Sequence, residues 1–339
     1  MSAGLRWTRG ASSTPRYVGV GEGAAALYAA IDDLPGRRGA LERLALKTIG
    51  RRPGRRADEP DIAEAWARVL ETHETLGPIR TALFVYTGFY KDTVLAGVID
   101  TGEVRFAKVF RDLEAGAAEQ AKHDSLARFA AGPVALAPIV YAGNGIVAYE
   151  LLPRADRTPD PHRLEAAAHA IAAAALGASR PRDSVAADEL RTTVAERLAA
   201  LGEGQAAEAA KKLDVAHVPL GVAHGDFTPW NTFGLPDGRL ALVDYERVAE
   251  RAPYTDAWHL RTQQAALGGK PGTAASAAAQ VAAEAGVSRS EATMWYLTYV
   301  LEELRQDLSD WFDAGRRHRQ LRRLIGVRAS LLRDHARTV

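Results

Sequence analysis

The sequence predicts an α+β protein with a small antiparallel sheet of five strands, preceded by a helical N-terminal extension and followed by a mostly helical region. Three observations support this: β-rich runs separated by turn residues fill residues 79–152, helical patterns dominate residues 153–339, and residues 1–78 hold helical patterns without a strand pair. These segments are the expected domains. The 339 residues, 47% of them hydrophobic, can bury a large core.

Helical patterns in the N-terminal extension cover Gly23–Asp32, Gly39–Ile49 and Pro60–Leu76. Residues 1–57 carry eleven Lys and Arg against four Asp and Glu. Such a basic face could meet nucleic acid, a phosphorylated ligand or an acidic partner, or it could simply be solvated. The whole chain has a net charge of +1, so its charge does not favour nucleic acid or a membrane surface, and no nucleic-acid partner is expected.

The segment Tyr17–Ala24 resembles a strand that enters a helix through the glycine pattern G-x-G-x-x-A of dinucleotide-binding folds. That fold requires a second strand ending near an acidic residue about 20 positions later. The chain instead continues into Pro35-Gly36 and another helical pattern, which disfavours dinucleotide binding.

Five β-rich runs make the predicted sheet, and the turn signals between them include Asp100-Thr101-Gly102 and Gly143-Asn144. The runs are Thr81–Tyr86, Thr93–Ile99, Glu103–Phe110, Leu136–Ala142 and Gly145–Leu151. In the third run Lys108 alternates with Phe106 and Phe110, so all three side chains point to one face. An ammonium group on an apolar face requires an anion, unless Lys108 reaches solvent from an edge strand.

The region after Asp160 is predicted to be mainly helical. Its helices are Pro161–Leu176, Ser184–Leu201, Gly204–Leu213, Ser290–Ala314 and Arg316–His335. An acidic run within the fourth helix could face a cationic aminocyclitol, or it could be a solvated surface neutralised by nearby arginines. The run consists of Glu302, Glu303, Asp307, Asp310 and Asp313.

The segment His224–Asn231 and the later Asp244 carry the residues best suited to chemistry. Transfer of a γ-phosphoryl group requires an oriented acceptor hydroxyl and divalent cations on the phosphates. A carboxylate such as Asp226 can deprotonate a hydroxyl, while the Asn231 amide and the Asp244 carboxylate supply the oxygen ligands that Mg²⁺ prefers. Each residue alone could be an ordinary loop or strand-end residue, but the joint pattern predicts a phosphoryl-transfer site.

The pattern His-Gly-Asp, then Asn five residues after the Asp, and the later Val243-Asp244-Tyr245-Glu246 resemble the catalytic and metal-binding loops of the aminoglycoside phosphotransferase and choline kinase group. This group belongs to the protein kinase-like superfamily, so the resemblance implies a bilobal kinase-like fold. It also implies that Asp226 is the catalytic base and that Asn231 and Asp244 bind magnesium. Gly225 and Tyr245 replace the residues typical of protein kinases, which favours a small-molecule acceptor.

The resemblance implies further roles outside this window. Lys108 matches the phosphate-binding Lys of the third strand, and Glu119 in the helix predicted over 113–130 is expected to hold it. The turn containing Gly88 resembles the loop that covers the phosphates, and the segment with Glu150 and Leu152 resembles the hinge that binds adenine. Two residues are expected to support the catalytic loop, namely His224 and Asp256.

The sequence contains no Cys, which excludes disulfides and thiolate zinc sites and is typical of a cytoplasmic enzyme. Residues Met1–Gly10 lack the apolar core of a signal peptide. The Ala-rich run Ala166–Leu176 is shorter than a membrane span, so no such span is expected.

The function predicted from the sequence is therefore transfer of phosphate from ATP, with GTP not excluded, to a hydroxyl of an aminoglycoside, sugar or related natural product with the help of Mg²⁺. One alternative is a catalytically silent, nucleotide-binding pseudokinase. Another is a kinase of a glycan or biosynthetic intermediate whose acceptor site is shaped by residues 1–77. The acceptor and the oligomeric state stay open.

Overall fold

A computed structural model represents the chain as two compact units. The first unit comprises residues up to Ala121 together with Ala137–Pro153, and the second comprises Lys122–Leu136 and Arg154–Val339. The structure describes residues 17–21, 27, 60–85, 93–130, 132–156, 159–267, 274–315 and 317–336. The helical patterns expected over Gly23–Asp32 and Gly39–Ile49 lie outside these residues, apart from Leu27.

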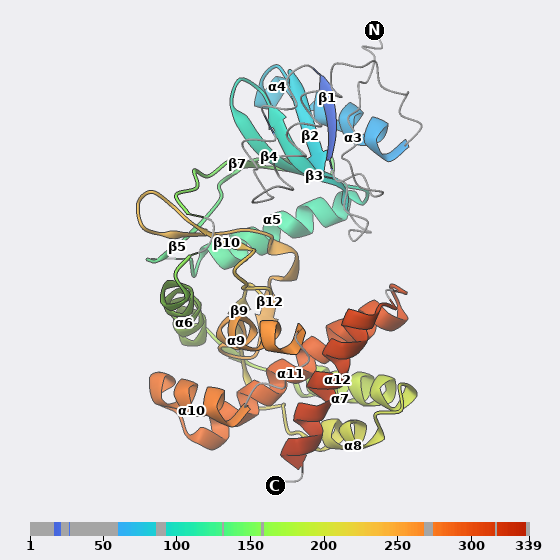
Figure 1. Ribbon diagram of the computed structural model, residues 1–339, viewed down its shortest axis with the longest axis vertical. Coiled ribbons are helices and arrows are strands. Elements are labelled where there is room, and N and C mark those ends of the chain that lie inside the picture. The colour runs from blue at the N-terminus through green and yellow to red at the C-terminus, as the bar shows by residue number, and fades with distance from the viewer. Residues whose placement is uncertain are drawn as a thin grey trace. The chain divides into compact units, whose positions relative to one another are not determined.

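The first unit is built on an antiparallel sheet whose strand order is β1-β2-β3-β4-β7-β6 (Figure 1). Each of the five runs expected from the sequence contributes a strand to it, and the fold class is confirmed. Their bounds are β2 (Thr81–Val85), β3 (Thr93–Asp100), β4 (Val104–Phe110), β6 (Ile139–Gly143) and β7 (Ile146–Glu150). The β6–β7 turn places Asn144 and Gly145 at positive φ, as a tight hairpin requires.

A sixth strand, β1 (Tyr17–Gly21), adds to the edge of this sheet by pairing antiparallel with β2. The strand in the dinucleotide-like segment therefore exists, but its sheet is antiparallel. A dinucleotide-binding unit requires parallel strands, so the pairing excludes that fold.

Helix α3 (Pro60–Glu71), followed by the single turn α4 (His73–Leu76), packs against strands β3 and β4. Alternate residues of the strands supply the core beneath α3, because successive side chains of a strand point to opposite faces. Phe84, Ile99 and Val109 belong to this core and are fully buried. Lys108 lies on the opposite face of β4, so its side chain is on the side of the sheet away from this core.

The expected strand Leu136–Ala142 is wrong as a single element. Pro138 interrupts it, and the chain forms two strands that join different sheets. The first part, β5 (Val134–Leu136), pairs parallel with β11 (Leu240–Leu242) in the second unit, while β6 joins the sheet of the first unit.

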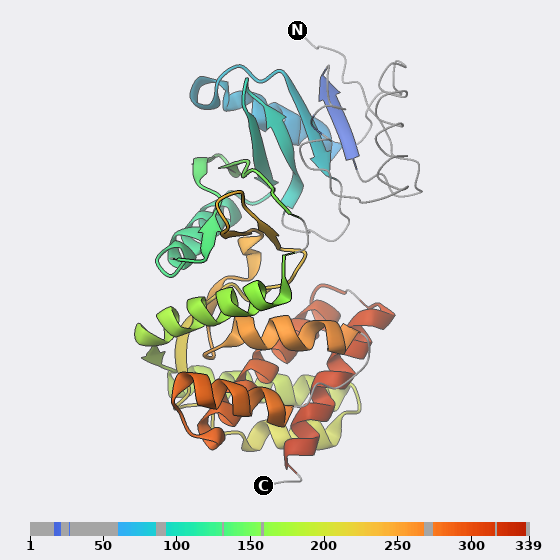
Figure 2. The same cartoon turned by 60° about the vertical axis from the view of Figure 1, so that its left-hand side comes forward.

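The second unit is mostly helical, and its helices are shown in green to red in Figure 2. They are α6 (Pro161–Gly177), α7 (Ser184–Ala200), α8 (Gly204–Lys212), α9 (Thr255–Leu267), α10 (Ala274–Ala285), α11 (Arg289–Phe312) and α12 (Arg319–Ala336). Side-chain caps begin several of them: Asp160 accepts from His162 N at 2.7 Å, ahead of Pro161, and Ser288 accepts from Glu291 N at 3.1 Å. Helix α11 contacts α7, α9, α10 and α12 and so forms the centre of the unit.

Two small sheets carry the loops of the second unit. Strand β9 (Pro219–Ala223) lies between β8 (Arg180–Pro181) and β12 (Ala249–Arg251), and β10 (Thr232–Gly234) pairs with β11. The segment 224–231 connects β9 to β10 and is therefore fixed at both ends. None of the helices in the described part of the chain is long and apolar enough to cross a bilayer.

Candidate active site

The loop after β9 begins with His224 and Gly225, whose backbone is held by one carboxylate. Asp256, in the first turn of α9, accepts the backbone N–H groups of His224 at 2.9 Å and of Gly225 at 2.8 Å. It is 2% exposed, so these bonds are shielded from water. Such contacts fix the loop backbone, which is what a loop-supporting role for Asp256 requires.

Gly225 is required by the local geometry. Its φ is +78°, and a Cβ at this position would lie 2.4 Å from the carbonyl oxygen of Arg247 and 2.9 Å from Nε of Arg251. Only glycine combines that backbone conformation with so close an approach. The His-Gly-Asp sequence is therefore dictated partly by packing against the segment that contains Arg247 and Arg251.

The His224 ring joins the loop to the strand that precedes Asp244. Its Nε2 donates to the carbonyl of Val243 at 3.1 Å, and its Nδ1 accepts the backbone N–H of Asp226 at 3.3 Å. One ring nitrogen donates while the other accepts, so the ring is the neutral tautomer. Burial lowers the pKa of His224 in agreement with this, although nearby carboxylates oppose the shift. The role of His224 in this geometry is therefore structural: its ring holds the loop against the segment that precedes Asp244.

Asp226 lies next in the loop, with each of its carboxylate oxygens held by a separate side chain. His259 Nε2 lies 3.0 Å from Oδ1, and Asn231 Nδ2 donates to Oδ2 and to the backbone oxygen of Asp226, both at 3.0 Å. Burial alone would raise the pKa of Asp226, but the hydrogen bond and charge of His259, together with Arg247, bring it below the ordinary value. The carboxylate is therefore ionised and able to accept a proton.

Asn231 and Asp244 are tied together through the backbone. Val243 N donates to the Asn231 carbonyl at 3.0 Å, which places the end of β11 beside the end of the loop. Asp244 has φ +70° and ψ +76°, a left-handed conformation that costs a residue with a Cβ about 1–3 kcal/mol. Backbone strain of this kind concentrates at functional sites, and it sets Asp244 apart from an ordinary strand end.

These two residues offer the donors that Mg²⁺ prefers. Because the Asn231 amide nitrogen is engaged by Asp226, its Oδ1 is directed away from that carboxylate, and Asp244 contributes a carboxylate. No group of three or more His, Cys, Asp or Glu able to hold a metal occurs among the described residues. Mg²⁺ commonly binds one or two protein groups plus substrate phosphates, so an amide and a carboxylate fit it.

Lys108 and Glu119 form a buried ion pair in the first unit. Nζ lies 2.8 Å from Oε1 of Glu119, and the two residues are 5% and 2% exposed. Glu119 lies on α5 (Leu113–Ala127) and also accepts the hydroxyl of Tyr149 at 3.0 Å. Strand β7 carries Tyr149 beside β4, so both groups that bind Glu119 come from neighbouring strands. The structure thus brings together the two residues that the sequence suggested would pair.

The remaining predicted residues are less informative. Gly88 lies outside the described residues. Glu150 ends β7, and its backbone N–H donates to the carbonyl of Pro138 at 2.9 Å, while Leu152 follows as a partly buried residue. Their adenine-binding role stays a prediction.

Sequence reasoning missed His259 and the charged cluster behind it. His259 follows Asp256 by three residues, and this spacing places both on one helix face. The acidic run of α11 was expected to face an acceptor or solvent, and for three of its members this is wrong. Glu302, Glu303 and Asp307 are 6%, 0% and 7% exposed and are paired with arginines. Burial of these carboxylates requires arginines that come from several other segments.

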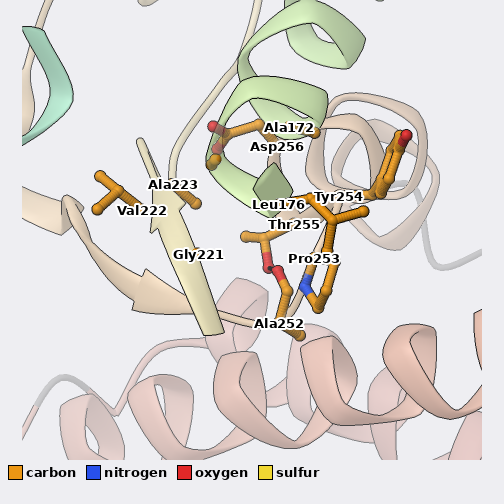
Figure 3. A pocket seen from close by; sticks show the side chains of 11 residues that line it. Ala172, Leu176, Gly221, Val222, Ala223, Ala252, Pro253, Tyr254, Thr255 and Asp256 are labelled. Carbon is orange, nitrogen blue, oxygen red and sulfur yellow. Dashed lines mark hydrogen bonds between the residues drawn. The ribbon is translucent and has the colours of Figure 1, made fainter. Parts of the chain in front are cut away.

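A small cavity lies beside Asp256, between β9, α6 and the start of α9 (Figure 3). Its volume is about 10 Å³, roughly enough for one water molecule. It is lined mainly by small apolar residues, including Ala172, Gly221 and Ala252. This cavity is too small for a substrate.

The chain has a protein kinase-like fold, since two solved structures with TM-scores above 0.5, both named as small-molecule kinases or phosphotransferases, match 81% of it. A putative fructosamine-3-kinase from Haemophilus somnus 129PT matches with a TM-score of 0.54 at 10% identity, covering 81% of this chain and 99% of its own.

A macrolide 2'-phosphotransferase type I matches with a TM-score of 0.51 at 12% identity, covering 81% of this chain and 98% of its own. Choline kinase LicA from Streptococcus pneumoniae gives a TM-score of 0.48 at 13% identity, with 79% and 99% covered. No known family profile and no curated protein sequence matches the chain. At these identities the similarity establishes the fold alone.

Proposed function

We propose that the protein is a phosphotransferase that moves the γ-phosphate of ATP to a hydroxyl group of a small molecule. The observation that supports it most is the position of the Asp226 carboxylate, whose two oxygens are held by Asn231 and His259. A general base must be positioned as well as deprotonated, and a loop anchored by Asp256 meets the first requirement.

In the reaction, Asp226 orients the acceptor hydroxyl and takes its proton. The acceptor oxygen forms a bond to the γ-phosphorus as the bond between that phosphorus and the ADP oxygen breaks. Each carboxylate oxygen has two lone pairs, so Asp226 can accept this proton while Asn231 and His259 stay bonded to it. A base of this kind contributes about 10²–10⁴-fold to the rate.

Asn231 and Asp244 are the residues that would hold Mg²⁺, which neutralises charge on the phosphates when bound. The strained backbone of Asp244 supports this role, because a strained residue persists only where the surrounding structure enforces it. Lys108 is assigned to the nucleotide phosphates. Glu119 and Tyr149 fix its ammonium group at a buried position on the sheet.

The acceptor is proposed to be a sugar, an aminoglycoside or a related natural product. The names of the matching structures, which include a fructosamine kinase and a macrolide phosphotransferase, guide the choice of compounds to test. The acidic run of α11 gives no support for a cationic acceptor, because three of its five carboxylates are buried against arginines.

The test is a screen of hydroxylated small molecules for acceptor-dependent release of ADP, with GTP run in parallel and the product confirmed by a mass gain of one phosphate. Asp226→Asn should lower kcat by about 10²–10⁴-fold. Asp237→Asn is the matched control, since Asp237 is a half-exposed carboxylate paired with Arg239 in the turn between β10 and β11. An Asp226→Asn variant with wild-type turnover would contradict the assignment.

The alternative to this proposal is that the protein binds a nucleotide without catalysing any transfer. It would bind ATP in a magnesium-dependent way, as calorimetry would detect, yet consume none across the acceptor panel. In that case Asp226→Asn would bind ATP as tightly as the wild type, and neither protein would release ADP with any acceptor.

A further inference from the structure

His259 lies between two carboxylates, although neither its sequence position nor the resemblance assigned it a role. Its Nε2 is 3.0 Å from Oδ1 of Asp226, and its Nδ1 is 3.5 Å from Oε2 of Glu303. The side chains of His259 and Glu303 are fully buried. The imidazole therefore connects Asp226, which is partly exposed, with the interior of the helical unit.

Glu303 is a fixed negative charge at the inner end of this connection. Arg247 and Arg251 contact its Oε1 at 2.7 and 3.1 Å, and Arg328 contacts its Oε2 at 2.8 Å. Burial would raise the pKa of Glu303, but the charges of Arg247, Arg328, His259 and Arg251 lower it far below the ordinary value. Glu303 thus offers His259 a permanent acceptor.

The hydrogen-bond inventory around Tyr299 indicates how His259 is protonated. Thr262 Oγ1 donates its single hydrogen to the Trp258 carbonyl at 2.8 Å, so at its 3.1 Å contact with the Tyr299 hydroxyl it can only accept. Tyr299 then has no hydrogen left for His259 Nδ1, 3.4 Å away, and must accept there. Nδ1 therefore donates toward Tyr299 and Glu303 while Nε2 donates to Asp226, which makes His259 an imidazolium.

The first two turns of α9 consequently serve the loop in two ways. Asp256 fixes the backbone of residues 224 and 225, and His259, one turn later, fixes the side chain of Asp226. Helix α11 holds these turns in place, because Glu302 accepts the backbone N–H of Ala252 at 3.2 Å just before them. The other group on the Asp226 carboxylate, Asn231, is a proposed metal ligand, whereas His259 has no such second assignment in the site.

We propose that His259 is a positioning residue for the phosphotransfer reaction: it donates hydrogen bonds from both ring nitrogens and thereby fixes the Asp226 carboxylate against Glu303. The mechanistic part of this inference rests on the proposed function. A catalytic group must be held within about 0.5 Å of its productive position, and a buried imidazolium anchored at its far side provides that restraint.

Three substitutions at position 259 separate the two ring contacts. In His259→Gln the amide nitrogen can reach the position of Nε2 and donate to Asp226. In His259→Asn the shorter side chain places the amide nitrogen only at the position of Nδ1. His259→Leu loses both hydrogen bonds. We expect kcat to fall about 10–10²-fold for the Leu and Asn variants and only a few-fold for Gln, with both KM values within about two-fold of wild type. Equal losses in Gln and Leu, or wild-type kcat in Leu, would overturn the proposal.

A second pair of variants keeps the test valid if His259→Leu fails to fold. Tyr299→Phe removes the oxygen that faces Nδ1 and should lower kcat a few-fold. Tyr296→Phe is its control, one turn earlier on α11, because the Tyr296 hydroxyl is buried without a hydrogen-bond partner among the described residues. Equal kcat values in the two variants would contradict a role for the Nδ1 contact.

The protonation of His259 is measurable without any turnover. In protein with ¹⁵N-labelled histidine, the pair of ring signals absent from the spectrum of His259→Gln belongs to His259, and both should have shifts typical of protonated nitrogens at pH 7. A signal typical of an unprotonated Nδ1 would overturn the inference. If both ring nitrogens are protonated but no acceptor is ever phosphorylated, the proposed function is wrong, while the hydrogen bonds from His259 to Asp226 and Glu303 are still supported.

Discussion

The two units each bury an ion-pair assembly, and the two assemblies differ in how many parts of the chain they join. Lys108 and Glu119 are eleven residues apart and form one pair, with Tyr149 as a third member. Glu303 binds Arg247, Arg251 and Arg328, which lie 56, 52 and 25 positions from it. A single pair can serve a ligand that arrives later, whereas a carboxylate shared by three guanidinium groups is already saturated and acts as a structural centre.

The first prediction tests whether the Glu303 cluster is such a centre. Glu303→Gln leaves three arginines and His259 around a neutral amide, and loss of one partner from a buried ionic group typically costs 3–5 kcal/mol. We expect the free energy of unfolding, measured by urea denaturation, to fall by about that amount. The control is Glu250→Gln, because the Glu250 pair with Arg180 is exposed and should contribute little. If both variants lost the same free energy of unfolding, the Glu303 cluster would be no more important for stability than an exposed ion pair.

The second prediction tests whether the Lys108 pair serves a ligand. Lys108→Met should lower kcat/KM by about 10²–10³-fold, since one group that stabilises charge at the reacting phosphates commonly supplies that much. It should also destabilise the unit by removing the positive charge that pairs with the buried Glu119 carboxylate. A triple variant, Lys108→Met with Glu119→Leu and Tyr149→Phe, removes the whole polar set.

The triple variant should recover stability without recovering activity, because replacing a complete buried ion pair by apolar groups is often neutral or stabilising. Urea denaturation and steady-state kinetics on the same preparations measure the two quantities. If activity returned together with stability, the pair would have only a structural role, and the contrast with the Glu303 cluster would disappear.

The same difference in chain separation explains which parts of the fold and site could be predicted from the sequence. Strands β2, β3, β4 and β7 follow from β-rich runs and the turn residues between them, which are local signals. Lys108 and Glu119 lie on consecutive elements, so their meeting could also be anticipated. The division of the run 136–142 was missed because the apolar run continues across Pro138, while the partner of β5 lies about a hundred residues later in β11.

The Glu303 cluster could not be predicted in this way. A helix with Glu302, Glu303 and Asp307 has the composition of a solvated surface, and only the arrival of arginines from the β12 region, α12 and the segment before α7 makes its burial favourable. His259 depends on the same packing, because its Nδ1 has a partner only when α9 and α11 are side by side.

The third prediction compares two buried tyrosine hydroxyls, one from each unit. Tyr149 donates to the Glu119 carboxylate at 3.0 Å, and a hydrogen bond to a charged group contributes about 1.5–3 kcal/mol. Tyr149→Phe should lower the free energy of unfolding by about that amount. Tyr296, whose pKa burial raises to about 12, has no hydrogen-bond partner among the described residues, so Tyr296→Phe should leave stability unchanged or raise it. A larger loss at Tyr296 than at Tyr149, by urea denaturation, would reverse this comparison.

The last prediction uses pH to separate two carboxylates within the cluster. The pKa of Glu303 is lowered by its arginines, so as pH falls through the unfolded value of about 4.3 the unfolded chain takes up a proton that the folded chain does not. Its stabilisation is therefore complete above that pH and is lost below it. Burial instead raises the pKa of Asp307, despite Arg328, so its contribution to stability changes with pH in the opposite sense.

Between pH 5 and pH 3 the free energy of unfolding of the wild type should therefore fall more steeply than that of Glu303→Gln, by up to about 1.4 kcal/mol per pH unit for one proton. Asp307→Asn should have the reverse effect and steepen the fall, because it removes a carboxyl group that the folded chain protonates first. Urea denaturation at pH 3, 4, 5 and 6 measures the slopes. Identical slopes for the three proteins would mean that neither carboxyl changes protonation on unfolding, and a buried Glu303 held as an anion by three arginines would then be excluded.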